Sequence, residues 1–363
     1  MNENIKKVWE LADASVKRFA PEKMRWQWGQ ALYLYALSLI DKEHGTDKYT
    51  DYLKAYYDYK IENGYRMNTS DTAAPALAAL YLYEKTGEEK YNDVLKRAYL
   101  YFKDSPKILE GMPNHQGTGI ESYIYPKSIW IDSMMMYGVF VTSYARFLQD
   151  DELLSFAEKQ PRLFAKYLLC KEEGLFYHSY WTRRKTHFPV KKIFWGRGNG
   201  WVTASVPLFV DMFKDEAEKK YVIDMHKKLS EKLLKYQKEN GYFETVFNRP
   251  GETYEESSAT MLIAAGWFYG YRKGYLDKTY YDAAVKAFDA VVNDFVIAED
   301  NLISMPKISG PTSPWPLVTF LVYKITPTKH NYSYGLASAI FAALEYDKAQ
   351  QEENKRNGGE RLI

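Results

Sequence analysis

The stretch Glu239-Asn240-Gly241-Tyr242-Phe243 decides the fold, because it is one copy of a pattern that recurs along the chain. In each copy a helix ends in polar residues and is followed by glycine, then by an aromatic or apolar residue. The other copies are Glu62-Asn63-Gly64-Tyr65, Leu109-Glu110-Gly111-Met112 and Glu172-Glu173-Gly174-Leu175-Phe176, with a weaker one at Glu299-Asp300-Asn301-Leu302. Each glycine is predicted to cap a helix end in the left-handed conformation.

The spacing of these copies indicates a repeated structural unit. After Gly64 the next three glycines follow at intervals of 47, 63 and 67 residues, and Asn301 follows 60 residues later. A unit of about 60 residues divides the 363-residue chain into six. Each unit is expected to hold an inward helix, a turn, a second helix and a long loop.

Apolar residues recur at helical spacing through most of the chain. The segment 26–40 carries them at 28, 31, 32, 35, 36, 39 and 40. Further helices are predicted over 72–83, 91–102, 130–148, 153–169, 202–213, 221–236, 259–271, 280–295 and 335–344. Six helical hairpins either stack as an open scaffold or close into a ring. Three long loops rich in Trp, His and Arg favour closure around one site. We therefore expect a single all-α (α/α)6 barrel over residues 1–363, with a frayed tail from Lys348.

Composition narrows the classes of function. The 49 basic and 47 acidic residues are well mixed and leave a net charge of +2, which argues against nucleic-acid binding. No apolar run is long enough to cross a membrane. Cys170 is the only cysteine, which excludes an internal disulfide, and the first residues lack the apolar centre of a signal peptide. We expect a cytoplasmic protein. Aromatic residues make up 17% of the chain, which fits either a large aromatic-lined cavity or a merely aromatic core.

The densest group of binding residues is Trp195-Gly196-Arg197-Gly198-Asn199-Gly200-Trp201. Tryptophan offers a flat apolar face, arginine a fork of donors for a carboxylate, and asparagine an amide for hydroxyl groups. Glycine permits close backbone approach and unusual dihedral angles. We interpret the segment as part of a site for a sugar acid. The alternative is a tight turn with two buried tryptophans and a surface arginine.

Two aspartates stand at the predicted starts of apolar helices. Asp132 follows Trp130-Ile131, and Asp71 holds the same place one repeat earlier. Each has an alternative role as a helix cap. Contact with tryptophan and methionine is expected to raise the pKa of Asp132 by desolvation. Helix starts converge at one end of a ring, which predicts that both carboxylates meet there as an acid and base pair.

Two histidines are candidates for the site, but neither stands in a pattern that decides its role. His178 lies in the aromatic segment 175–181, where either a functional or a structural role is open, and His115 is the weaker candidate. No His-Glu pair at helical spacing indicates zinc, and no Asp-rich loop matches a calcium hand. We therefore expect no metal and no organic cofactor.

On these residues the chain resembles glycoside hydrolase family 105, the unsaturated rhamnogalacturonyl hydrolases, and more distantly family 88, the unsaturated glucuronyl hydrolases. The resemblance runs from Trp26 to about Leu344. It rests on Trp130-Ile131-Asp132, on His178, on the segment 195–201 and on Glu256-Ser257-Ser258-Ala259-Thr260. Gly196 stands where alanine is expected, and Ser70-Asp71 is less distinctive than the Asp132 motif.

The resemblance implies an (α/α)6 barrel that removes a 4,5-unsaturated uronic acid from lyase-generated pectin oligosaccharides. Asp132 would protonate C4 of the double bond and then activate the water that attacks C5, with Asp71 keeping that proton in place and orienting the sugar. His178, Arg197 and Asn199 would contact the substrate. Trp130, Trp195 and Trp201 would form the walls. The resemblance identifies neither the sugar that follows the uronate nor the oligomeric state.

Three alternatives remain at this stage. An inverting glycosidase would use Asp71 and Asp132 as base and acid on saturated oligosaccharides. A sugar epimerase would favour two central histidines, and a non-catalytic carbohydrate-binding protein would bind without turnover. The basic loop 183–192 either recognises an acidic leaving sugar or is a solvated loop, and we favour the second reading.

Overall fold

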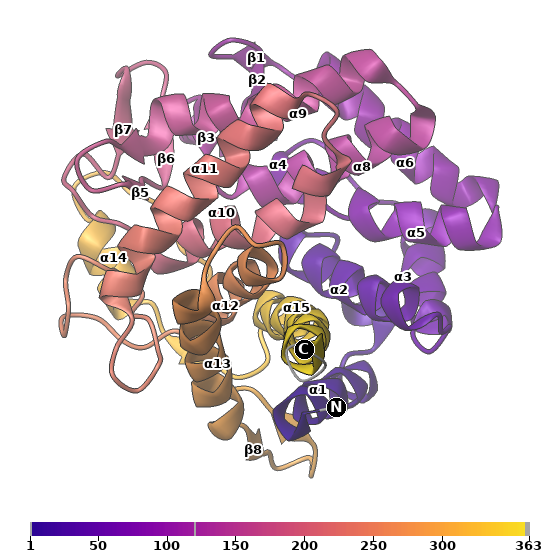
Figure 1. Cartoon of the computed structure of the whole chain (residues 1–363). Coiled ribbons are helices and arrows are strands. Elements are labelled where there is room, and N and C mark those ends of the chain that lie inside the picture. Colours follow the sequence, from indigo (N-terminus) through magenta and orange to yellow (C-terminus); the bar gives the residue numbers. More distant parts are fainter. Residues whose placement is uncertain (1, 120, 360–363) are drawn as a thin grey trace.

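The computed structural model describes residues 2–119 and 121–359, and helices dominate this part of the chain (Figure 1). A ring of inner helices forms the centre. Each inner helix packs against the next, and the last packs against the first. In chain order the members are α2 (Trp28–His44), α5 (Ala76–Thr86), α8 (Val139–Leu148), α10 (Gly196–Phe209), α12 (Ser257–Arg272) and α15 (Ser333–Gly359).

A second set of helices surrounds this ring. It comprises α1 (Glu3–Arg18), α3 (Thr50–Asn63), α6 (Glu89–Asp104), α9 (Asp151–Leu168), α11 (Glu216–Leu233) and α13 (Lys278–Asn293). Outer and inner helices alternate along the chain. The expected (α/α)6 barrel is confirmed, and the open scaffold is excluded because α15 contacts α2.

The two sets differ in sequence for a physical reason. Every residue of α12 from Ser257 to Tyr271 is buried, because neighbours enclose an inner helix on all sides. Outer helices bury one face only. On α13 the buried set is Tyr281, Ala283, Ala284, Ala287, Phe288, Val291 and Val292. Asp150, Asp215 and Asp277 cap the N-termini of outer helices with their side chains.

Short strands and helices occupy the connections. Four antiparallel pairs are β1 (Lys107–Ile108) with β2 (Met112–Pro113), β4 (Leu169–Cys170) with β5 (Leu175–Phe176), β8 (Val296–Ile297) with β9 (Ile303–Ser304), and β10 (Ile308–Ser309) with β11 (Thr328–Lys329). One sheet has the order β3 (Ser128–Trp130), β6 (Ser179–Trp181) and β7 (Thr186–Phe188). The short helices are α4 (Ser70–Ala73), α7 (Glu121–Ile124), α14 (Thr319–Ile325) and the π-helical turn η2 (Met134–Gly138), and the 3-10 turns are Pro21–Lys23, Val210–Met212 and Leu234–Tyr236.

The repeat glycines all have the predicted positive φ, but only one of them caps a helix. Gly64 ends α3, whereas Gly111 turns between β1 and β2 and Gly174 turns between β4 and β5. Gly241 lies in a turn after the 3-10 turn that follows α11. The helices α6 and α9 end before the polar-Gly pattern, so the repeat marks small hairpins as well as helix ends.

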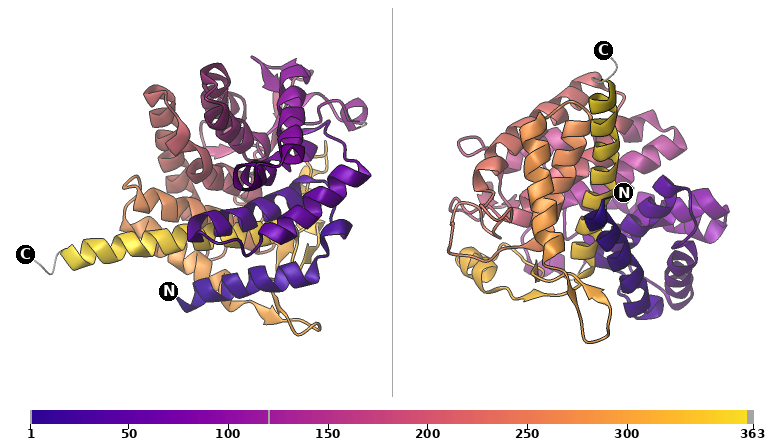
Figure 2. Two further views of the ribbon diagram at one scale, coloured as in Figure 1. Left: turned by 90° about the vertical axis from the view of Figure 1, so that its right-hand side faces the viewer. Right: turned by 60° about the horizontal axis from the view of Figure 1, so that its bottom comes forward.

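Three other expectations need correction. The predicted helix 130–148 starts as strand β3 and passes through η2 before α8 begins at Val139. Helix α3 was not predicted, because its tyrosines blur the apolar stripe and only Thr50, Leu53, Tyr56 and Tyr57 are buried. The tail from Lys348 is helical as far as Gly359, and α15 projects beyond the other helices (Figure 2).

Close contact between α10 and α12 generates a stability prediction. A Cβ at Gly266 would lie 2.5 Å from the backbone oxygen of Thr203, whereas a Cβ at Gly138 would meet nothing nearer than 3.7 Å. We expect Gly266→Ala to lower the free energy of unfolding by about 1–3 kcal/mol, because the two backbones must separate. Gly138→Ala is the matched control. It should leave the free energy of unfolding unchanged or raise it by up to about 1 kcal/mol. Urea unfolding measures both, and equal stabilities would contradict the packing argument.

Candidate active site

The residues singled out in the sequence meet at the end of the barrel where the inner helices start. Asp71 lies in α4 just before α5, and Asp132 lies between β3 and η2, ahead of α8. Arg197 is in the first turn of α10, and Glu256 is the N-cap of α12. The predicted convergence of helix starts therefore places these side chains on one end of the ring.

Asp132 and His178 form the centre of this group. Nε2 of His178 lies 3.4 Å from Oδ2 of Asp132, and the side chains are 0% and 14% exposed. Both atoms are buried, and neither has a hydrogen-bond partner among the residues that the structure describes. The two atoms are ionic partners of each other and make no further hydrogen bond within the described residues, so each keeps hydrogen-bonding capacity for a ligand.

The hydrogen bond at the other ring nitrogen of His178 fixes the tautomer of the imidazole. Nδ1 lies 2.6 Å from the hydroxyl of Tyr323, whose pKa burial holds well above its ordinary value. Burial lowers the pKa of His178, although Asp132 opposes this effect, so the ring is neutral near pH 7. Tyr323 then donates to Nδ1, and we assign the ring proton to Nε2, facing Asp132.

The pKa of Asp132 lies below its ordinary value, opposite to the expected direction. Burial acts to raise it, as the sequence argument assumed. The hydrogen-bonding and charge effects of His178, together with the charge effect of His115, outweigh burial and lower it. The expectation was wrong because it counted the apolar neighbours of Asp132 and not the two imidazoles.

His115 links the second carboxylate to this centre. Its Nε2 lies 3.6 Å from Oδ1 of Asp71, and its Nδ1 lies 2.9 Å from the hydroxyl of Ser133. The His115 ring stacks on Trp130 at 4.5 Å, and Trp130 meets the ring of His178 edge-on at 5.0 Å. Burial lowers the pKa of His115 to about 4, so it is neutral near pH 7. The sequence ranked His115 too low, because no local pattern shows its stacking on Trp130.

Asp71 is not the cap of its helix. Thr69 caps α4 through a reciprocal pair with Thr72, and the Asp71 side chain is 32% exposed. Asp71 opens onto a cavity of about 480 Å³. The residues that line this cavity, here named the Asp71 cavity, are Trp26, Gln27, Arg66, Asn68, Thr69, Asp71, Thr72 and Gln116.

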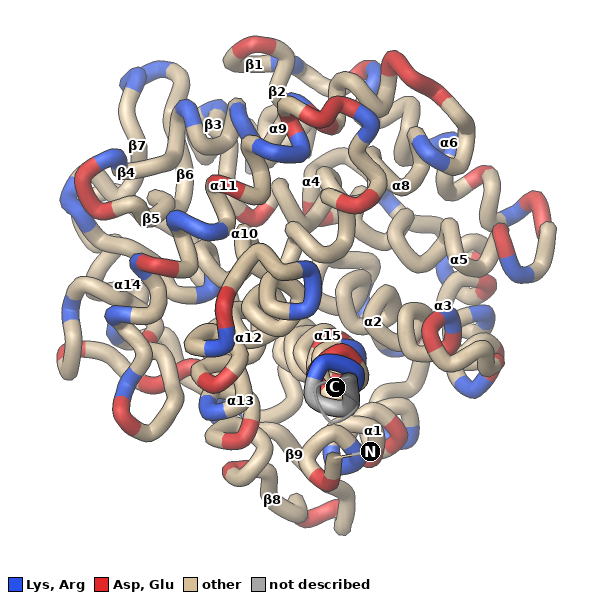
Figure 3. The backbone as a smooth tube through the Cα atoms, viewed as in Figure 1, with Lys and Arg blue, Asp and Glu red and all other residues tan. Residues whose placement is uncertain are grey.

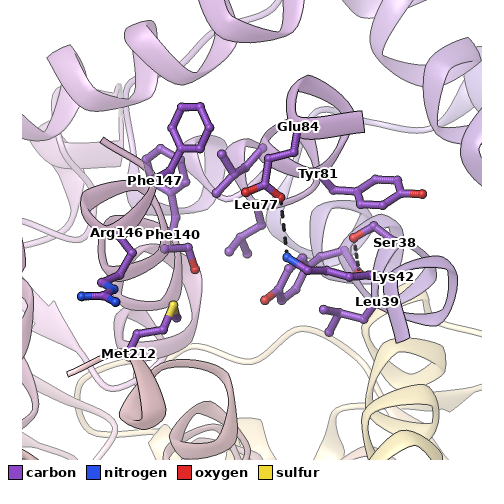
Figure 4. A pocket seen from close by; sticks show the side chains of 13 residues that line it. Ser38, Leu39, Lys42, Leu77, Tyr81, Glu84, Phe140, Arg146, Phe147 and Met212 are labelled. Carbon is purple, nitrogen blue, oxygen red and sulfur yellow. Dashed lines mark hydrogen bonds and ion pairs between the residues drawn. The ribbon is translucent and has the colours of Figure 1, made fainter. Parts of the chain in front are cut away.

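A different cavity, of about 350 Å³, lies at the opposite end of the inner helices (Figure 4). Leu77, Phe140 and Met212 line it, and an ion pair of 3.5 Å joins Lys42 to Glu84 across it. None of the predicted site residues lines this cavity, so the candidate chemistry belongs to the end that holds Asp132.

The segment Trp195 to Trp201 is helical, not a loop or tight turn. Trp195 is the N-cap of α10, and the three glycines stand inside the helix. A Cβ at Gly198 would lie 2.8 Å from the Trp195 ring, and one at Gly196 would lie 2.7 Å from the backbone oxygen of Glu244. The glycines therefore serve close approach and not unusual dihedral angles.

Arg197 is buried beneath the site and holds a loop. Its guanidinium donates to the backbone oxygens of Ser309 and Gly310, each at 3.0 Å, and lies 3.8 Å from Oε1 of Glu256. Its Nε has no hydrogen-bond partner within the described part of the chain. The geometry shows a structural role for Arg197, and the direct substrate contact stays a prediction.

Trp195 contacts His178 directly, whereas Asn199 and Trp201 are fully buried and are placed by other contacts. The Trp195 ring stacks on His178 at 4.1 Å. The Asn199 side chain bonds to the backbone of Phe176 and Trp195. Trp201 is fully buried. Asn199 thus holds the backbone of Phe176 and Trp195, and Trp201 packs edge-on against Trp28. The substrate contacts predicted for Asn199 and Trp201 stay predictions.

Charge is mixed over the molecule, and blue and red segments alternate along the helices (Figure 3). In the basic loop, Arg183, Arg184 and Lys185 are exposed between β6 and β7. Lys192 forms ion pairs with Glu172 and Glu173. This loop is largely solvated, as favoured from the sequence.

Two further observations concern cofactors and membranes. Within residues 2–119 and 121–359, no group of three or more His, Cys, Asp or Glu side chains is arranged to hold a metal ion. None of the helices in the described ranges is long and apolar enough to cross a membrane.

A closed ring of helical hairpins, with a buried carboxylate and tryptophan rings beside His178 at one end, fits the class of helical-barrel glycoside hydrolases. The chain belongs to Glycosyl Hydrolase Family 88, whose sequence model matches residues 2–350. The family membership that the sequence motifs indicated is thereby confirmed.

Individual relatives are distant but cover most of the chain. An unsaturated rhamnogalacturonyl hydrolase, YesR, of Bacillus subtilis (strain 168) is 25% identical over 337 residues, covering 92% of this chain and 93% of that protein. An unsaturated 3S-rhamnoglycuronyl hydrolase of Alteromonas sp. (strain LOR) is 25% identical over 305 residues, which cover 80% of this chain and 69% of that protein. A family 105 glycoside hydrolase structure from C. acetobutylicum ATCC 824 superposes with a TM-score of 0.84 at 22% identity, covering 94% and 99%. The unsaturated glucuronyl hydrolase of Bacillus sp. GL1 superposes with a TM-score of 0.70 at 14% identity, covering 94% and 95%.

The buried position of Arg197 generates a second stability prediction. Arg197→Met removes one partner of a buried ion pair and the two hydrogen bonds to backbone oxygens, so we expect a loss of about 3–5 kcal/mol in the free energy of unfolding. Arg184→Met, on the exposed loop, is the matched control and should stay within about 0.5 kcal/mol of the parent. Urea unfolding gives both values.

A stable R197M variant that lost only substrate affinity would contradict the structural role. If R197M does not fold, R197K keeps the charge but not the planar fork, and it should show a smaller loss of the same kind.

Proposed function

We propose that this protein removes a 4,5-unsaturated uronic acid from the non-reducing end of lyase-generated rhamnogalacturonan oligosaccharides. The observation that carries the proposal is the buried pair of Oδ2 of Asp132 and Nε2 of His178, 3.4 Å apart, with the rings of Trp130 and Trp195 packed against His178. The names of the Bacillus subtilis and Alteromonas relatives support an unsaturated uronide as substrate.

The reaction is hydration of the vinyl ether. Asp132 gives its proton to C4, and the positive charge that develops at C5 is stabilised by the ring oxygen. The Asp132 carboxylate then takes a proton from the water that attacks C5, so the acid is regenerated. The product is a hemiketal at C5. It opens to a ketone, and the resulting hemiacetal at C1 releases the leaving sugar.

The surrounding side chains have supporting parts in this proposal. His178 donates from Nε2 and holds the Asp132 carboxylate, while Tyr323 holds the imidazole in that tautomer. Trp130 and Trp195 pack against the flat unsaturated ring. Asp71, linked through His115, orients the sugar and adds negative charge that favours a protonated Asp132. Arg197, Asn199 and Trp201 keep their predicted substrate contacts as part of the proposal.

The proposal extends to the size of the substrate, the partners of the enzyme and its location in the cell. The substrate is a small oligosaccharide, with no nucleic acid, no membrane and no cofactor involved. We place the enzyme in the cytoplasm, in keeping with a single, buried cysteine, Cys170.

The test is a spectrophotometric assay on the unsaturated disaccharide of rhamnogalacturonan. We expect loss of the ultraviolet absorbance of the conjugated double bond together with release of rhamnose. Unchanged absorbance on several lyase products, with cleavage of saturated oligosaccharides instead, would favour the inverting glycosidase. Binding without any turnover would favour the carbohydrate-binding protein.

Asp132→Asn tests the assigned acid. The amide cannot deliver the proton to C4, so we expect kcat to fall by a factor of about 10³ or more while the fold is kept. Asp51→Asn, at an exposed position on α3, is the control and should have full activity. Initial rates and circular dichroism together measure this outcome, and substantial turnover by D132N would place the acid elsewhere.

The lowered pKa of Asp132 predicts the pH dependence. The free enzyme must hold a proton on Asp132, and a lowered pKa means that this form declines as pH rises. We expect kcat/KM to fall about tenfold per pH unit through the neutral range. A bound uronate carboxylate adds negative charge and raises the pKa of Asp132, so kcat should hold to a higher pH than kcat/KM.

His178→Gln checks the cause of that dependence. Removing the imidazole removes the largest influence that lowers the pKa of Asp132, so the fall of kcat/KM should move to higher pH. A kcat/KM that rises with pH in the parent enzyme would contradict the protonated-Asp132 mechanism.

A further inference from the structure

The tryptophan rings beside His178 are closed off in this structure. Trp195 is 2% exposed and Trp130 is 6% exposed, although the proposed function packs both rings against the unsaturated sugar. The Asp71 cavity does not uncover them, because neither ring lines it. To pack against these rings, a sugar has to displace the element that now covers them.

Over Trp195 the covering element is α14. The Tyr323 ring lies nearly parallel to the Trp195 ring, with 6.1 Å between the ring centres. Phe320 packs against the same small cluster, which joins Trp195 and Tyr323 to Ile193 and Val246 and is separate from the main core of the barrel. The cover over Trp195 is therefore not part of the packing that holds the ring of helices together.

The cover over Trp130 belongs to the same stretch of chain. Tyr125 lies edge-on to Trp130 at 5.2 Å and donates a hydrogen bond to the backbone oxygen of Pro314 at 3.1 Å. Trp315 lies edge-on to Tyr125 at 6.0 Å. Residues 311–327, here named the cover segment, thus close one wall directly and hold Tyr125 against the other.

The cover segment joins the barrel at a narrow, fixed base. The strands β10 and β11 pair beside it, and the amide of Gly310 donates to the backbone oxygen of Pro327 at 3.0 Å. Arg197 holds this base through the backbone oxygens of Ser309 and Gly310. The two ends of the segment therefore lie together on a firm support, which is the arrangement of a hinged loop.

Between its ends the cover segment is weakly attached. Within the described part of the chain, three hydrogen bonds tie residues 311–326 to other segments, and they join Thr312 to Arg197, Pro314 to Tyr125 and Tyr323 to His178. Only three residues of the segment are buried, namely Pro314, Thr319 and Tyr323. The outer face is solvent-exposed at Leu317, Val318, Leu321 and Ile325. Segments with so few buried contacts open without unfolding of the whole domain.

We propose that the cover segment opens to admit the unsaturated uronate and closes over it, and that closing sets Tyr323 on His178. This inference rests on the proposed function, because it assumes that a sugar ring packs against Trp130 and Trp195. Tyr323 is in this account a positioning residue, which reaches the imidazole only in the closed state. Proton transfer by Asp132 is thereby confined to enzyme whose cover segment is closed.

Thiol labelling tests the opening, because Cys170 is the only cysteine of the chain. In a C170A background, Val246→Cys places a thiol in the cluster beneath the cover segment, at a position that is 0% exposed. Val206→Cys, equally buried but in the main core on α10, is the matched control. With iodoacetamide we expect the V246C protein to react at least about tenfold faster than V206C, because local opening needs less free energy than global unfolding.

The substrate should oppose this opening. Adding D132N to the V246C protein prevents turnover, and the unsaturated rhamnogalacturonan disaccharide at about ten times its Kd should then slow labelling about tenfold. Hydrogen exchange of the parent enzyme checks the opening without a new cysteine. Amides of α14 should exchange at least about tenfold faster than those of α12.

Tyr323→Phe tests the coupling to His178. Loss of this hydrogen bond should speed labelling of the free V246C protein about five- to tenfold. It should also lower kcat by a similar factor while KM stays within about twofold, because Tyr323 acts through His178. L321Q changes an exposed residue of the same helix, keeps its helix propensity and should alter neither quantity.

Equal labelling of V246C and V206C, with α14 exchanging as slowly as α12, would overturn the inference. Labelling of V246C that the bound disaccharide does not slow would overturn it as well, and a Y323F enzyme with unchanged kcat would remove Tyr323 from it. Failure of the proposed function has a separate signature, because the disaccharide then keeps its absorbance with the parent enzyme. The free V246C protein still reports in that case whether the cover segment opens.

Discussion

The packing of α15 against α2 is the contact on which the rest of the structure depends. It joins the last inner helix to the first and so turns a row of helical hairpins into a ring. A closed ring brings the starts of all inner helices to one end. Side chains from α4, the β3–η2 turn, α10 and α12 can then share one site although they are far apart in sequence. Within that end, the pairing of β3 with β6 sets His178 beside Asp132, and Tyr323 from α14 reaches the other nitrogen of His178.

The site keeps an ionisable pair, Asp132 and His178, inside an apolar and aromatic surround. Within the described residues the two facing atoms make no hydrogen bond to a third group, and the rings of Trp130 and Trp195 pack against His178. A buried carboxylate without such neighbours would take up a proton. The imidazoles keep it ionised until substrate arrives. The same arrangement stabilises the acid's charged form at rest and leaves it accessible to an anionic sugar ring.

Much of the barrel was predictable because its signals are local. Helical spacing of apolar residues located most of the helices, and the repeat of about 60 residues indicated six helical hairpins. Asp132 was identified from the motif Trp130-Ile131-Asp132, and His178 from its aromatic segment 175–181. Tyr323 was not identified, since its role depends on His178, a neighbour 145 residues away in sequence that folding brings to it. The glycines of 195–201 indicated a turn from composition, but their function is helix packing that only the three-dimensional structure shows.

The central claim is that water adds to the double bond and does not displace the sugar at C1. The most direct test is a single turnover of the unsaturated disaccharide in ¹⁸O-labelled water, followed at once by borohydride reduction and mass spectrometry of the uronate fragments. The account predicts that the label enters at C5, with the leaving sugar unlabelled. Label at C1 of a uronate that still holds its double bond would contradict hydration and identify the enzyme as an ordinary glycosidase.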